Sequence, residues 1–163
     1  KRFHWSSSNA GFTCTSCMVI NLEVRRFLDL EALEHGLTIF SFRLWTRVQF
    51  QTRDGWTPVS PALIDTGAPF SVLPKSLWSD VDAHPVGFTS ELRGLIPLPT
   101  AMLKARLAQI TCRLSDEMTT AAPMGLWVLL ADGEVPIVLG CHGFLDRLKL
   151  MLDGPRQIAS LEF

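Results

Sequence analysis

The sequence predicts an all-β protein, built as a closed β-barrel with one or two short helices. Two observations predict this fold class: many short apolar or alternating segments bounded by Gly- and Pro-containing turns, and only brief stretches with helical spacing between them. A length of 163 residues fits one ordinary domain with a short extension and is too short for two full lobes. One hydrophobic core is therefore expected.

The clearest predicted strand begins at Ile39. Apolar side chains alternate with polar or basic ones along it, which is typical of a half-buried antiparallel strand. An Arg-Asp-Gly turn at 53–55 predicts a hairpin, and the returning segment 56–64 leads directly to Asp65. The predicted apolar face of the first strand comprises Phe40, Phe42, Leu44, Val48 and Phe50.

Further strands are predicted at 102–114 and 126–130, and a terminal hairpin is predicted around the Asp-Gly turn at 153–154. A short helical segment is expected after Pro74, because proline suits the first turn of a helix. Residues 80–99 are rich in Gly and Pro. They predict turns and bends, where a mobile hairpin fits.

The sequence predicts a division between an N-terminal extension and a barrel domain. Residues 1–36 are expected to form an extension with a helix at 21–35, and residues 37–163 to form the barrel domain. Asn21 can cap that helix and the His-Gly step at 35–36 can end it. Two interpretations stay open: the helix packs on its own domain, or it docks on a second subunit.

Composition excludes several classes of partner. Fifteen basic and 16 acidic residues give a formal charge of −1, so no attraction to nucleic acid or to an anionic membrane is expected. No window supplies the ~18 consecutive apolar residues of a membrane-spanning helix. Hydrophobic residues make up 47% of the chain, with a mean hydropathy of +0.22, which leaves apolar surface that a subunit interface would cover.

Four cysteines are too few and too unevenly spaced to predict a disulfide framework: Cys14, Cys17, Cys112 and Cys141. Free thiols in a reducing compartment are expected, which favours the cytoplasm. Cys14 and Cys17 have the Cys-x-x-Cys spacing of half a zinc site or a redox pair, but no second pair accompanies them, so chance spacing is preferred. We expect neither a metal nor a cofactor.

A chemical motif follows the predicted strand that ends at 62–64. Asp65, Thr66, Gly67 and Ala68 place a carboxylate at a strand end, followed by a glycine that permits tight torsions and close backbone approach. A second motif, Ile-Val-Leu-Gly at 137–140, lies downstream. In this order and spacing the two motifs resemble those of the retropepsin-like (retroviral-type) aspartic proteases, as a bacterial-type member, over residues 37–163.

The resemblance implies a barrel of the acid-protease type and assigns a role to each motif residue. Asp65 would be the catalytic acid, and the other residues of its turn would support it. In the family, the second motif packs beneath the catalytic turn, and a glycine-bearing hairpin closes over substrate as a flap. The implied supporting and flap residues are Thr66, Gly67, Ala68, Val138, Leu139, Gly140, Gly94, Leu95 and Ile96.

This chain has one Asp-Thr-Gly, whereas the chemistry needs two carboxylates. The resemblance therefore implies a homodimer that pairs Asp65 with its own copy across a twofold axis. Two such close carboxylates share a proton and activate water, which implies cleavage of extended peptide or protein substrates at apolar sites and an acidic optimum. The alternative is a catalytically silent retropepsin-like module for dimerisation or peptide binding.

One departure from the family pattern concerns an ion pair beside the turn. Many members place Arg after the second motif's glycine and an acid just past the catalytic turn, but here Cys141 follows Gly140, and Pro69 and Phe70 follow Ala68. Dimer stability would then depend on other contacts, such as the apolar surplus or the segment 21–36. For Cys141 two interpretations stay open, a buried inert thiol or a redox-sensitive one.

Overall fold

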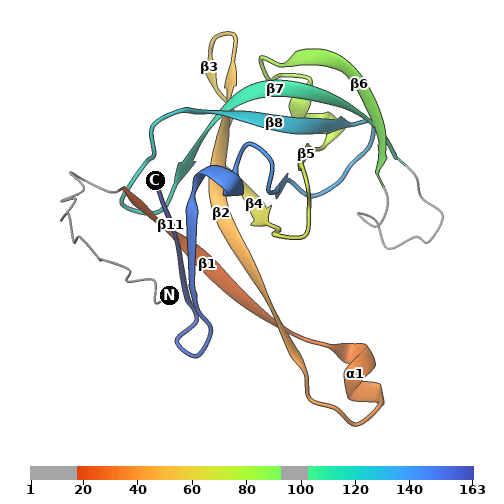
Figure 1. Cartoon of the computed structure of the whole chain (residues 1–163), viewed down its shortest axis with the longest axis vertical. Coiled ribbons are helices and arrows are strands. Elements are labelled where there is room, and N and C mark those ends of the chain that lie inside the picture. The colour runs from red at the N-terminus through yellow and green to blue at the C-terminus, as the bar shows by residue number, and fades with distance from the viewer. Residues whose placement is uncertain (1–17, 93–102) are drawn as a thin grey trace, which may run out of the picture.

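The computed structural model describes residues 18–92 and 103–163, and these form an all-β protein (Figure 1). Six strands close into a barrel, because each pairs with the next and the last pairs again with the first. The predicted fold class, a closed β-barrel with short helices, is confirmed. In order around the barrel the strands are β2 (Phe40–Thr52), β4 (Ser60–Ile64), β9 (Val138–Leu139), β5 (Ser71–Leu73), β8 (Met124–Ala131) and β7 (Leu103–Ser115).

The remaining elements extend this barrel. β6 (His84–Leu92) pairs with β7, and β3 (Gly55–Trp56) completes the predicted hairpin with β2. The predicted terminal hairpin is present as β10 (Lys149–Asp153) and β11 (Ile158–Glu162). In the part of the chain that is described, the helices are α1 (Leu30–Glu34), α2 (Lys75–Trp78) and the 3-10 turn η1 (Leu145–Arg147); α2 follows Pro74 as expected.

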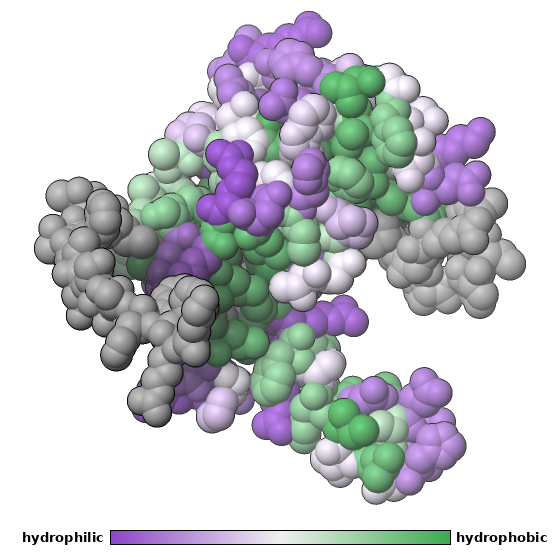
Figure 2. All heavy atoms as spheres, in the orientation of Figure 1, coloured by the Kyte–Doolittle hydropathy of each residue, from purple (hydrophilic) through white to green (hydrophobic). Residues whose placement is uncertain are grey.

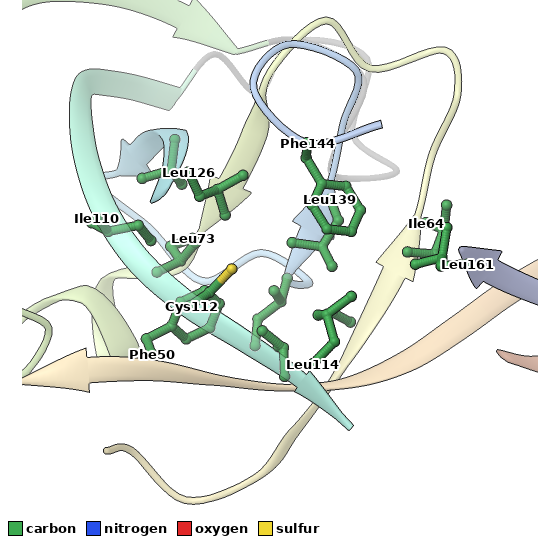
Figure 3. Close-up of a cluster of buried hydrophobic side chains, with 14 of the residues drawn as sticks. Phe50, Ile64, Leu73, Ile110, Cys112, Leu114, Leu126, Leu139, Phe144 and Leu161 are labelled. Carbon is green, nitrogen blue, oxygen red and sulfur yellow. The ribbon is translucent and has the colours of Figure 1, made fainter. Parts of the chain in front are cut away.

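The barrel interior is filled by the inward-facing side chains of its strands (Figure 3). On β2, Val48 and Phe50 are fully buried, and each such side chain contributes about 1.5–3 kcal/mol relative to an exposed one. Phe40 and Phe42 were predicted on the same face, but they are exposed. The reason is that β2 extends beyond the barrel there and pairs with β1 (Val19–Leu28) alone.

The predicted helix at 21–35 is wrong, because most of that segment is the strand β1 and only α1 is helical. β1 pairs with β11 at its start and with β2 further along, so residues 19–28 belong to the same sheet as the barrel strands. Ile20 and Leu22 are buried, as alternation in a strand requires. The helix cap is Asp29, whose side chain accepts a hydrogen bond from the Ala32 N–H at 3.0 Å.

Some sequence predictions fall outside the described residues. These are the Cys-x-x-Cys pair, Cys14 and Cys17, and the three flap residues, Gly94, Leu95 and Ile96. The strands β6 and β7 pair up to Leu92 and Leu103, the described residues on either side of 93–102. Across residues 18–92 and 103–163, the helices are all too short to cross a membrane.

Candidate active site

Asp65 lies at the end of β4 and begins a tight turn that leads to β5. Its carboxylate oxygen Oδ1 accepts a hydrogen bond from the Gly67 N–H at 2.8 Å, and its carbonyl accepts one from the Ala68 N–H at 3.3 Å. The carboxylate oxygen Oδ2 makes no hydrogen bond to any described residue. The turn therefore fixes the carboxylate by one oxygen and leaves the other available.

The second motif lies directly between the two strands that flank this turn. β9 runs parallel to β4 and antiparallel to β5, so the chain enters the turn on one side of β9 and leaves it on the other (Figure 1). The Leu63 N–H donates to the Ile137 carbonyl at 2.9 Å, and the Asp65 N–H donates to the Leu139 carbonyl at 3.0 Å. The structure thus brings the two predicted motifs together.

Gly140 packs against the backbone of the turn itself. A Cβ atom at Gly140 would lie 2.6 Å from the carbonyl of Phe70 and 2.7 Å from that of Ala68, distances at which backbone atoms must move. The Gly140 N–H also donates to the buried hydroxyl of Ser71 at 3.1 Å. A glycine is required here for close approach of two backbones.

Two residues after the motif hold the outer part of the turn. The Cys141 N–H donates to the Ala68 carbonyl, and the His142 N–H donates to the Pro69 carbonyl, both at 2.8 Å. The Cys141 thiol donates to the Thr66 carbonyl at 3.2 Å. Cys141 therefore places a partly exposed thiol against the turn. Successive carbonyls of the turn are bound by the residues after β9.

A separate apolar cluster connects the turn with the end of the β6–β7 pairing that adjoins residues 93–102. Its buried members are Val72, Ala105, Leu129, Ala131, Val135 and Val138. Ala68 and Phe70 of the turn pack against it from one side, and Leu92 and Leu103 at the hairpin ends also pack against it. The hairpin that would carry the predicted flap residues is thus anchored on the same cluster as the candidate catalytic turn.

Thr66 and Gly67 are exposed at the outermost point of the turn. The Thr66 hydroxyl makes no hydrogen bond within the described residues. A cleft of about 720 Å³ lies at the base of β1 and β2 and does not include the Asp65 turn. The Thr66 side chain is therefore exposed, and the half-buried Asp65 lies directly before it.

Sequence reasoning missed Ser71 and His142. Ser71 is a hydroxyl residue inside the apolar run 70–73. A hydroxyl in such a run indicates a buried polar group that has a hydrogen-bond partner. His142 contacts the turn through its backbone N–H and through its ring, whose centroid lies 5.3 Å from that of Phe70. No group of three or more His, Cys, Asp or Glu side chains that could hold a metal ion occurs among the described residues.

Comparison with known proteins finds a similarity at the level of structure. The chain is similar to the crystal structure of a retropepsin-like aspartic protease from Rickettsia conorii, with a TM-score of 0.42 and 14% sequence identity. The similarity covers 91% of this chain and 96% of that chain. Neither a protein-family model nor a curated protein matches the sequence.

Proposed function

We propose that this protein is an aspartic endopeptidase that acts as a homodimer on extended peptide or protein substrates. The observation that carries the proposal is the half-buried Asp65 carboxylate, held at the start of a turn whose backbone is bound by Leu139 of β9 and packed against Gly140. A positioned carboxylate with one unoccupied oxygen suits general acid–base chemistry. The sequence motifs around Asp65 support the same assignment.

The second carboxylate would come from Asp65 of a second copy. The chain has one Asp-Thr-Gly, and the other Asp-Gly steps, at Asp54, Asp132 and Asp153, lack the intervening hydroxyl residue. An isologous pair would bring the two Asp65 turns together at a twofold axis. The exposed Thr66 hydroxyls would then have partners across that axis.

Within such a pair the two carboxylates would share one proton, because two negative charges at close range are unfavourable. The ionised carboxylate would take a proton from water, and the protonated one would polarise the scissile carbonyl. Oδ1 is held by Gly67, so Oδ2 is the oxygen available for this exchange. The rate should be highest at acidic to mildly acidic pH, and a profile that rises into alkaline pH would contradict this mechanism.

The substrate would bind as an extended strand beneath the β6–β7 hairpin. Extended peptides bind by main-chain hydrogen bonds, and pockets for alternate side chains select among them. Phe70, which is half-buried beside the turn, favours apolar side chains near the cut. The expected flap residues, Gly94, Leu95 and Ile96, lie outside the described residues.

The test is cleavage of a mixed peptide library from acidic to neutral pH by the full chain and by Asp65→Asn. Loss of at least about 10²-fold in rate is expected for Asp65→Asn, since a positioned acid–base group contributes 10²–10⁴-fold. Asp54→Asn, in an Asp-Gly turn without the hydroxyl residue, is the matched control and should retain full activity. Undiminished cleavage by Asp65→Asn would refute the proposal, and peptide binding without cleavage would favour the silent module.

A further inference from the structure

The outer halves of β1 and β2, with α1 between them, form a protruding hairpin that we call the arm, residues 25–43. Pairing of β1 with β11 ends at Leu22, and pairing of β4 with β2 begins at Leu44, so no strand among those described borders the arm. Figure 2 shows its tip standing apart from the barrel. Every arm residue except Ala32 is exposed. An isolated two-stranded hairpin is at best marginally stable in water.

The arm exposes apolar side chains that continue the barrel core outward. Val24 pairs with the buried Leu44 in the sheet, and Arg26 with Phe42 and Leu28 with Phe40 continue the same face. Apolar surface continues over the tip, where Leu30 is 69% exposed (Figure 2). The exposed large apolar residues of the arm are Phe27, Leu28, Leu30, Leu33, Leu37, Ile39, Phe40 and Phe42. Contiguous apolar surface of this kind marks an interaction site.

Charges are segregated along the arm. The part next to the barrel, which we call the stem, carries Arg25, Arg26 and Arg43, whereas the tip carries Asp29, Glu31 and Glu34. Arg25 and Arg43 are directly opposite each other in the β1–β2 register, an arrangement that is unfavourable for like charges. Glu23 binds Arg25 at 2.7 Å, and Arg43 lies 5.2 Å from the centroid of the Phe27 ring. Further carboxylates would stabilise this stem.

These charges fit a second copy of the same arm. When two identical arms lie antiparallel, as a twofold axis allows, the acidic tip of each meets the basic stem of the other. We propose that the arm is a dimerisation element that binds a second copy of this chain. In the dimer, the tip of each arm contacts the stem of the partner's arm. In the view of Figure 1, the arm and the connection between β4 and β5 are both drawn below β7 and β8. The inference rests on the homodimer of the proposed function.

The base of the arm has space for this contact. The 720 Å³ cleft there is lined by Arg25, Trp45 and Arg47, and the buried Trp45 Nε1 and Thr46 Oγ1 have no partner within the described residues. The cleft also contains three carboxylates. Two of them are engaged: Glu23 by Arg25, and Asp116 by Asn21 and by the backbone of its own turn; the third is Glu117.

The decisive experiment uses charge reversal and mixing, with mass in solution as the readout. The tip-reversed chain carries Glu31→Lys and Glu34→Lys, and the stem-reversed chain carries Arg25→Glu and Arg43→Glu. Each alone should dimerise at least about tenfold more weakly than the wild type, since it places like charges at both contacts. An equimolar mixture should form heterodimers, because both tip-to-stem contacts are then attractive. Circular dichroism and thermal unfolding establish that each variant is folded.

A second pair of variants tests the apolar part of the contact. Leu33→Asp, at the tip, should weaken the dimer by at least about tenfold, whereas Val86→Asp, at a similarly exposed position on β6, should leave it unchanged. The inference would be overturned if every arm variant dimerised as strongly as the wild type. It would also be overturned if mixing the two reversed chains produced no heterodimer. A wild-type monomer that binds lipid vesicles through Leu33 would also overturn it.

Peptide cleavage separates this inference from the proposed function. If the proposed function and the arm inference both hold, the rate of cleavage falls with the dimer fraction in each reversed chain. The rate then recovers when the two reversed chains are mixed. If the arms hold the dimer but wild-type and Asp65→Asn chains cleave peptides equally, the proposed function fails and the arm inference stands. If cleavage depends on Asp65 while every arm variant remains dimeric, the arm inference fails and the proposed function stands.

Discussion

Gly140 lies so close to Phe70 that a Cβ atom on Gly140 would be 2.6 Å from the Phe70 carbonyl carbon and oxygen. These residues are far apart in the sequence, yet their backbones are in contact because β9 lies between β4 and β5. The position of the candidate catalytic turn therefore depends on the absence of a side chain on the neighbouring strand end. Small changes at Gly140 should be transmitted directly to Asp65.

The first prediction is that Gly140→Ala destabilises the protein and displaces the Asp65 turn. A methyl group would force backbone atoms apart, and overpacking of this kind costs about 1–3 kcal/mol or more. Urea unfolding measures the free energy, and peptide cleavage should fall further than stability alone explains. Gly154→Ala is the control, because a Cβ atom there meets nothing within 4 Å. Equal effects of the two substitutions would contradict the prediction.

Much of the barrel was predictable because its strands carry local patterns. Alternation along β2 and the Arg-Asp-Gly turn define a hairpin without reference to the rest of the chain. β1 was not predictable in this way, since Leu22, Val24 and Leu28 fit helical and strand spacing alike. Its pairing with β11, from the opposite end of the chain, decides between them. Local propensity cannot report such a distant partner.

The candidate site shows the same division. Asp65 and Gly140 belong to sequence motifs, so their proximity followed from a resemblance. Ser71 was missed because its partner, the Gly140 N–H, is 69 positions away in the sequence. The tip of the β6–β7 hairpin lies outside the described residues. A motif identifies the reacting group, whereas the atoms that hold it are defined by packing.

The second prediction concerns the buried hydroxyl of Ser71. Ser71→Ala removes the acceptor of the Gly140 N–H and leaves that donor buried without a partner, which should cost about 1–3 kcal/mol. Because the same N–H lies beneath the Asp65 turn, cleavage should also decrease. Ser79→Ala, at an exposed position after α2, should change neither quantity. Wild-type stability in Ser71→Ala would show that water or another group satisfies the donor.

The third prediction is a loss of stability at alkaline pH caused by Cys112. Burial in the barrel core raises the pKa of its thiol to about 12, from a usual value of 9.0. The unfolded chain loses this proton from about pH 9, whereas the folded chain keeps it. Stability from this thiol is therefore complete below pH 9 and is lost as pH rises toward 12, by up to about 1.4 kcal/mol per pH unit.

Cys112→Ala isolates this contribution. The variant should be less stable at neutral pH because of the cavity, but its free energy of unfolding should fall less steeply above pH 9 than that of the wild type. If the free energy of unfolding fell equally steeply above pH 9 in the two proteins, Cys112 would not be the cause of the loss. The native protein should also resist alkylation at Cys112, as peptide mapping by mass spectrometry can check.

The fourth prediction concerns acid stability and Asp116, which fastens the end of β7 to β1. The Asn21 backbone N–H, followed by those of Met118 and Thr119, lowers the pKa of the Asp116 carboxyl to about 2 from 3.8. The unfolded chain therefore binds the proton first, so this stabilisation is present above about pH 4 and is lost as pH falls toward 2. Asp116→Asn should lower the urea midpoint at pH 6 and flatten its change between pH 4 and 2, because an amide nitrogen cannot accept from Asn21. Asp54→Asn, at an exposed turn position, should show the same dependence of the urea midpoint on pH as the wild type. If Asp116→Asn also showed that dependence, the contact between β1 and the end of β7 would not depend on this carboxylate.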